Sequence, residues 1–252
     1  MIGIYGDSFA DTNPRELHDR EKEIWPWAYW LGESCKDKIE CHAVSATSLW
    51  FSFTKFLNTY RNYDKIVFCY TNYMRWNTLA DEYISLSHVR DPNDVPYLMP
   101  NFQETGSFLV EAYPILYRDD LNRFIYQHVF NEVNRLCKKY KIKLVNLLPF
   151  ENSTFYFPKG IGQMIDFSLN TGPCLTGLME VSTKEINDSE RLLERLKHKN
   201  DLRHCHINSY NNRILSSIIF ENMHTTNIKN VSLDSRFKFD ERFLVHAFDN
   251  DD

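Results

Sequence analysis

One serine near the start of the sequence and two histidines near its other end are the residue types that acyl transfer requires. Ser8 follows a short apolar run, and His204 and His206 follow Asp201 closely. A serine hydroxyl is a poor nucleophile at neutral pH. It needs a histidine to take its proton, a group to orient that histidine, and donors for the oxyanion. The sequence therefore contains the parts of a Ser-His-Asp triad.

The polar residues that could serve this chemistry stand at the ends of predicted strands. Residues 2–5 form an apolar run that stops at a tight turn and delivers the serine to its end. Ser45 and Ala46 stand near the end of a predicted strand at 39–48, and Thr71 and Asn72 end a predicted strand at 65–72. In a parallel sheet, functional groups gather beyond the carboxyl ends of the strands. We therefore expect these groups to meet at one edge of a sheet.

Apolar residues at helical spacing alternate with the predicted strands. Helices are expected at 22–35, with Pro26 near its start, at 49–63, 119–140, 183–199 and 208–222. A further buried strand is expected at 141–149. In the helix at 49–63 the predicted buried face is Leu49, Phe53, Phe56 and Tyr60; in the helix at 119–140 it is Leu121, Phe124, Ile125, His128, Val129, Val133 and Leu136. This alternation predicts a parallel sheet covered by helices on both faces.

Two stretches without periodicity interrupt this pattern. Residues 73–117, punctuated by prolines, are interpreted as an irregular insertion overhanging the site, and 150–182 are also expected to be irregular. We expect a single α/β domain over 1–231, followed at 232–252 by a docking segment or solvated acidic tail.

Five segments, in order along the chain, resemble the SGNH (GDSL-like) hydrolase family. They are GDSFA (6–10), IWPWAYWLG (24–32), VSATSLW (44–50), FCYTNYMR (68–75) and DLRHCHINSYNN (201–212). The resemblance implies a three-layer sandwich with a central parallel sheet in flavodoxin-like order. It also implies ester hydrolysis by a serine nucleophile without a cofactor.

The resemblance also implies a role for several residues. Ser8 would be the nucleophile and donate its backbone N–H to the oxyanion, while Asp7 would hold the turn. Ala46 stands where the family usually has a glycine whose N–H is an oxyanion donor, a role that alanine keeps if its dihedral angles suit. Asn72 matches the asparagine of the third block, although the usual Gly-x-Asn-Asp pattern is absent.

Two histidines compete for the role of general base. The family commonly places an aspartate three residues before the histidine, as Asp201 stands to His204. The residues after His206 instead match the family's helix-opening pattern, which favours His206 as the base with Asp201 orienting it. His204 is retained as the alternative base.

Function classes follow from this pattern and from the composition. We expect a serine esterase removing an O-acetyl or other short acyl group from a small molecule or a glycan. A binding domain with weak or no catalysis and an acyltransferase with the same nucleophile are the alternatives. A net charge of -5 disfavours nucleic acid as a partner. No metal site is expected, because no ligand pair at metal spacing accompanies His204 and His206.

Location is inferred from what the sequence carries and lacks. It shows no apolar run long enough to span a membrane, so no membrane partner is expected. No secretory leader is evident at its start. The six cysteines are scattered without a C-x-x-C pair, which indicates free thiols in a reducing compartment. These features together predict a cytoplasmic protein, and they leave its oligomeric state open.

Overall fold

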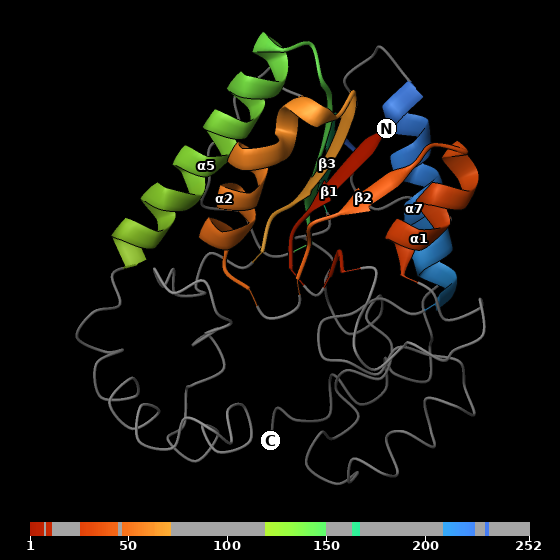
Figure 1. Ribbon diagram of the computed structural model, residues 1–252. Coiled ribbons are helices and arrows are strands. Elements are labelled where there is room, and N and C mark those ends of the chain that lie inside the picture. The colour runs from red at the N-terminus through yellow and green to blue at the C-terminus, as the bar shows by residue number, and fades with distance from the viewer. Residues whose placement is uncertain are drawn as a thin grey trace, which may run out of the picture.

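Six parallel strands form one sheet at the centre of the computed structural model (Figure 1). The structure describes residues 1–7, 9–11, 26–44, 47–71, 119–149, 163–166, 209–224 and 230–231. The strands are β1 (Ile2–Tyr5), β2 (Ile39–Cys41), β3 (Lys65–Cys69), β4 (Lys143–Leu148), β5 (Gln163–Asp166) and β6 (Asn230–Val231). Their order is β2-β1-β3-β4-β5-β6, with every neighbouring pair parallel. This confirms the predicted flavodoxin-like order, whose direction reverses beside β1.

Helices cover both faces of the sheet. The α-helices are α1 (Trp27–Cys35), α2 (Leu49–Thr59), α5 (Asp119–Lys139) and α7 (Ser209–His224), and a short 3-10 helix, η2 (Tyr60–Asn62), extends α2. In Figure 1, α2 and α5 lie on one face and α1 and α7 on the other. The predicted three-layer α/β architecture is therefore confirmed.

The alternation of side chains along the strands divides the core into two. On β1, Ile2 and Ile4 pack under α1 and α7, whereas Tyr5 points to the α2 and α5 face. On β3, Val67 and Phe68 divide in the same way. Because side chains of a strand alternate between faces, an all-apolar run serves both cores at once. The short buried runs seen in the sequence have this cause.

Two predicted elements differ from the structure. The strand predicted at 39–48 ends at Cys41, and beyond it His42 and Val44 donate backbone hydrogen bonds to Ile4 and Gly6 without forming a regular ladder. The stretch 150–182, expected to be irregular, contains β5. The four residues of that strand, QMID, are polar at both ends, so no apolar run like that of β1 marks it in the sequence. The predicted insertion at 73–117, the helix at 183–199 and the tail at 232–252 lie outside the described residues.

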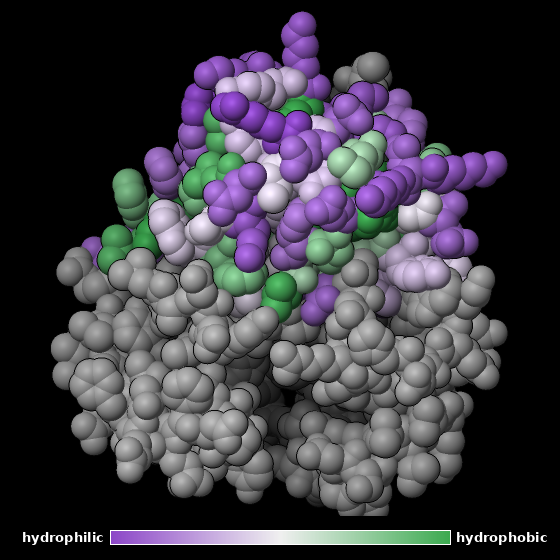
Figure 2. All heavy atoms as spheres, viewed as in Figure 1, coloured by the Kyte–Doolittle hydropathy of each residue, from purple (hydrophilic) through white to green (hydrophobic). Residues whose placement is uncertain are grey.

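The buried face of α5 was predicted only in part. Val129, Val133 and Leu136 are buried as expected, but Leu121 and Phe124 are 50% and 67% exposed. His128 was expected in the core and is exposed as well, stacked on Phe124. Apolar residues occur on more than one side of α5, so their spacing in the sequence does not decide which side of the helix is buried. The side that packs inward is fixed by Tyr126 and Phe130, which contact Tyr70 beyond β3. Figure 2 shows hydrophobic side chains at the amino-terminal end of α5, the end that carries Leu121 and Phe124, on an otherwise largely hydrophilic face.

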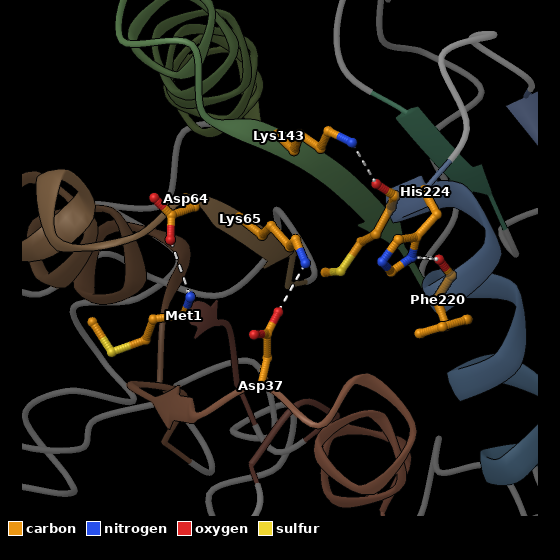
Figure 3. A network of polar contacts seen from close by, with 8 residues as sticks. Met1, Asp37, Asp64, Lys65, Lys143, Phe220 and His224 are labelled. Atoms are coloured by element: carbon orange, nitrogen blue, oxygen red, sulfur yellow. Dashed lines mark hydrogen bonds and ion pairs between the residues drawn. The ribbon is translucent and has the colours of Figure 1, made fainter.

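Ion pairs hold the opposite, amino-terminal edge of the sheet (Figure 3). Lys65 at the start of β3 donates to Asp37 at 2.8 Å, and the Met1 ammonium donates to Asp64 at 3.1 Å. The hydrogen bond from Lys65 lowers the pKa of Asp37. Lys143 at the start of β4 donates to the Met223 carbonyl at the end of α7. These contacts stabilise the amino ends of the strands, the side of the sheet opposite the predicted site.

Within the described residues, no helix has both the length and the apolar character needed to cross a bilayer.

Candidate active site

The residues predicted to perform the chemistry all lie outside the described residues, but their neighbours in the sequence do not. The predicted site residues are Ser8, Ala46, Asn72, Asp201, His204 and His206. The described neighbours are Asp7 and Phe9 on either side of the serine, Val44 and Thr47 on the two sides of Ser45 and Ala46, and Thr71 directly before Asn72. The described part of α7 follows the predicted base. The candidate site is therefore built from these bordering residues.

Asp7 holds the turn that carries the predicted nucleophile. Its side chain is fully buried, and its Oδ1 accepts a hydrogen bond from the Phe9 backbone N–H at 3.0 Å. Its backbone carbonyl accepts from Ala10 at 2.9 Å and from Asp11 at 3.0 Å. A carboxylate and a carbonyl that accept from the residues ahead are the pattern of a helix N-cap. The expectation that Asp7 stabilises this turn is confirmed.

Gly6 brings this turn against the end of β3. Its φ of +152° is one that residues with a side chain rarely adopt. A Cβ atom there would stand 2.8 Å from the Cβ of Cys69 and 3.0 Å from the Cys69 carbonyl oxygen. The glycine of the first block is thus required both by its dihedral angle and by the close approach of β1 and β3.

The second block is bound to the same turn. The Val44 N–H donates to the Gly6 carbonyl at 3.2 Å, and the buried Ser52 hydroxyl of α2 donates to the same oxygen at 3.1 Å. The hydroxyl and the backbone N–H of Thr47 both donate to the Val44 carbonyl, at 2.7 Å and 3.4 Å. Ser48 then caps α2 by accepting from the Phe51 N–H. The chain on both sides of Ala46 is therefore fixed beside the nucleophile's turn.

The third block is fixed by a side-chain contact. The hydroxyl of Thr71, itself buried, donates to Asp7 Oδ2. One residue earlier, the Tyr70 N–H donates to the Leu147 carbonyl at 2.9 Å, and its hydroxyl donates to Asn146 at 3.0 Å. Burial raises the pKa of Tyr70 well above its ordinary range, so its hydroxyl stays protonated and serves as a donor. Asn72 follows directly after this anchored pair.

A tryptophan connects the nucleophile's turn with the helix that follows the predicted base. The indole N–H of the fully buried Trp27 donates to the Phe9 carbonyl at 2.8 Å. The backbone N–H of the same residue donates to the Asn212 side chain in the first turn of α7, at 2.9 Å. On the same two helices, the guanidinium of Arg213 lies 4.1 Å from the centroid of the Trp30 ring. The start of α7 is therefore bound to α1 and, through Trp27, to the chain next to Ser8.

Sequence reasoning missed Thr71, Trp27 and Asn212 as parts of this arrangement. Each lies inside a segment that resembles the family, and the signal available was a polar residue in a buried context. Thr71 ends an apolar run, and Asn212 stands on the inward side of a helix. The helix expected at 22–35 was predicted from the spacing of its apolar residues, and the structure adds a hydrogen bond from the Trp27 indole.

One further titratable group approaches this edge of the sheet. His42 follows β2, stacks on Tyr5 with ring centroids 5.0 Å apart and exchanges a hydrogen bond with the Tyr63 hydroxyl. Burial lowers its pKa, and the nearby Glu40 carboxylate opposes that shift. Its partly buried ring packs on the α2 side of the sheet against Tyr5 and Tyr63, which belong to the core there. Among the described residues, no three His, Cys, Asp or Glu side chains converge as they would around a metal ion.

Comparisons with known proteins find resemblance at the level of fold. No protein-family model and no curated protein matches the sequence. A solved structure of a protein assigned to the lipolytic G-D-S-L family of Desulfitobacterium hafniense DCB-2 is similar to 88% of this chain and 98% of its own, at 8% identity and a TM-score of 0.42. An acetyl xylan esterase is similar over 87% and 98% at 11% identity and a TM-score of 0.38. An acetyl-xylooligosaccharide esterase from a Geobacillus species is similar over 91% and 96% at 10% identity and a TM-score of 0.30.

Proposed function

We propose that the protein is a serine esterase that hydrolyses an O-acetyl or other short acyl ester through an acyl-Ser8 intermediate. The observation that carries the proposal is the convergence of separate chain segments on the turn at 6–11. Hydrogen bonds join that turn, directly or through one tryptophan, to segments that border Ala46 and Asn72 and to the helix that follows His206. Acyl transfer to a serine requires the nucleophile, its base and the oxyanion donors in one place, and these hydrogen bonds between the bordering segments support that arrangement.

The proposed reaction proceeds in two halves. The Ser8 hydroxyl oxygen attacks the ester carbonyl carbon while His206 takes the hydroxyl proton. The former carbonyl oxygen becomes the oxyanion and accepts hydrogen bonds from the Ser8 and Ala46 N–H groups and from the Asn72 side chain. The bond to the alcohol then breaks, and the histidine gives its proton to the leaving oxygen. One water repeats these steps on the acyl-serine and releases the carboxylic acid, so no cofactor is needed.

Asp201 is proposed to orient the base and to stabilise its positive charge. His206 is the proposed base because of the residues that follow it, and His204 is the alternative because it stands three residues after Asp201. Asn212, which follows Asp201, His204 and His206 in the sequence, is anchored to Trp27, and Trp27 is bonded to the nucleophile's turn.

A fluorophosphonate probe tests the proposal, because only an activated serine reacts rapidly with it. We expect stoichiometric labelling of the wild-type protein, located at Ser8 by mass spectrometry of the digested protein. Ser8→Ala should abolish both labelling and hydrolysis of p-nitrophenyl acetate, a loss on the order of three or more decades. Turnover by Ser8→Ala within about tenfold of wild type would overturn the assignment of the nucleophile.

Variants of the remaining groups assign their roles. Asn72→Ala should lower turnover by about a hundredfold or more while leaving stability nearly unchanged, since an oxyanion donor matters most in the transition state. His206→Ala should be more damaging than His204→Ala; the reverse order would transfer the role of base to His204. Acetylated oligosaccharides and small acetyl esters, compared in the same assay, would define the substrate. The free thiols of the described cysteines suit action in a reducing compartment such as the cytoplasm.

A second candidate is a binding domain with the same architecture and weak or no catalysis. It is favoured by Ala46 in place of the usual glycine and by Tyr73 where the third block usually ends in aspartate. Binding of an acylated glycan without turnover, together with no fluorophosphonate labelling, would support it. An acyltransferase would be labelled at Ser8 like an esterase and would transfer the acyl group faster to an acceptor hydroxyl than to water.

A further inference from the structure

A buried carboxylate stands directly between the segments that carry the proposed nucleophile and the proposed oxyanion donor. Asp7 is fully buried, and burying a charge is costly unless donors surround it. Its two oxygens accept from different segments, Oδ1 from the Phe9 N–H and Oδ2 from the Thr71 hydroxyl. The carboxylate thus spans the carboxyl ends of β1 and β3.

Each contact of Asp7 constrains one catalytic neighbour. The Phe9 bond, with the bonds from Ala10 and Asp11 to the Asp7 carbonyl, fixes the backbone ahead of Ser8 relative to residue 7. The Thr71 bond fixes the residue immediately before Asn72. A nucleophile and an oxyanion donor must both come within about 3 Å of positions on the same reacting carbonyl group. The separation between their chain segments therefore has to be held within a narrow range.

We propose that Asp7 and Thr71 form a positioning pair that sets the distance between Ser8 and the amide of Asn72. The inference rests on the proposed function and deepens it, because it states how the oxyanion donors are kept in register with the nucleophile. Neither residue touches the substrate in this assignment. The pair acts on the transition state, since a donor displaced by about 1 Å can cost up to about a hundredfold in rate.

Thr71 allows the hydrogen bond to be removed with little change in shape. Thr71→Val replaces the hydroxyl by a methyl group, whereas Thr71→Ser keeps the hydroxyl. We expect Thr71→Val to lower kcat and the fluorophosphonate labelling rate by about 10- to 100-fold, with KM changed by less than about threefold. Thr71→Ser should remain within about threefold of wild type in every constant.

Ser52 provides a matched control. Its buried hydroxyl donates to the Gly6 carbonyl at 3.1 Å and does not contact the Asp7 carboxylate or Thr71 in any of the hydrogen bonds of the described residues. Ser52→Ala should lower the melting temperature about as much as Thr71→Val, because each removes one buried hydroxyl donor. Its kcat, measured well below both melting transitions, should stay within about threefold of wild type. Equal loss of kcat in the two variants would show a general weakening of the turn and overturn the inference.

A double variant tests whether Thr71 acts through Asn72. In an Asn72→Ala background the positioned donor is gone, so adding Thr71→Val should change kcat by less than about threefold. Full additivity of the two losses would overturn the inference. Wild-type protein that is not labelled at Ser8 would overturn the proposed function and the inference with it. Wild-type labelling with an unchanged rate in Thr71→Val would overturn the inference alone.

Discussion

Replacing Trp27 by phenylalanine tests the connection between the nucleophile's turn and α7 at its centre. The indole N–H donates to the Phe9 carbonyl at 2.8 Å inside a fully buried environment. Phenylalanine keeps an aromatic ring on α1 but has no donor. The backbone bond from residue 27 to Asn212 is made by the main chain and remains available in the variant. The substitution therefore isolates one hydrogen bond and a small loss of packing.

The expected cost follows from two contributions. A buried carbonyl left without its donor costs about 1–3 kcal/mol. The smaller ring leaves unfilled space and adds on the order of 1 kcal/mol, well below the cost of complete truncation to alanine. We therefore expect the free energy of unfolding to fall by about 2–4 kcal/mol in total. For a chain of this size, each kcal/mol lowers the melting temperature by about 2–4 °C.

Urea titration followed by far-ultraviolet circular dichroism measures this loss without depending on tryptophan fluorescence. Trp50→Phe is the control, because the same chemical change is made on α2 at a residue that is 37% exposed. Its free energy of unfolding should stay within about 0.5 kcal/mol of wild type. If Trp27→Phe is no more destabilising than Trp50→Phe, the hydrogen bond does not contribute as the structure implies, and the reasoning about this connection fails.

Three other predictions concern buried polar groups. Burial lowers the pKa of His42, so just below neutral pH the unfolded chain binds more protons than the folded chain, and stability falls on acidification. In His42→Phe the melting temperature should therefore fall less between pH 7.5 and 5 than it does in wild type. Burial raises the pKa of Cys137 to about 12, so iodoacetamide at pH 8 should modify it only after urea unfolding, whereas the half-buried Cys35 reacts sooner. Asn134 and Asn146 donate to each other at 3.2 and 3.1 Å, so replacing either one by leucine leaves the other without these hydrogen bonds. The losses in free energy of unfolding of the two single variants, measured by urea titration, should therefore sum to at least about 1 kcal/mol more than the loss of the double variant.

The layers of the fold could be predicted from the sequence because burial on both faces leaves a strong signal. The runs that became β1, β3 and β4 are almost wholly apolar, and α2 repeats large apolar residues at helical spacing. The short strands β5 and β6 gave no comparable signal. β6 has two residues, and pairing with β5 defines it rather than its own composition. Their position is a tertiary effect that single-sequence periodicity does not contain.

The candidate site was predictable in its parts but not in its connections. Ser8 and the histidines were found because acyl transfer requires particular residue types. Thr71 and Trp27 were not found as connecting residues, because a threonine at a strand end and a tryptophan in a helix occur for many reasons. Their roles depend on partners that are distant in the sequence, 64 residues away for the bond between Thr71 and Asp7. Such pairs become visible only when the sheet order brings β1 and β3 together.

The two edges of the sheet are stabilised by different kinds of contact, and this difference bears on where chemistry can occur. At the amino edge the partners are partly exposed charges such as Lys65 and Asp37, whose attraction water and salt weaken. At the carboxyl edge the contacts of Asp7, Thr71 and Trp27 are buried hydrogen bonds, each made in a single geometry. A site that must hold several groups within a fraction of an ångström needs the second kind, because exposed ion pairs permit many arrangements of nearly equal energy. The edge held by buried hydrogen bonds is therefore the one to which the proposed catalytic residues are attached.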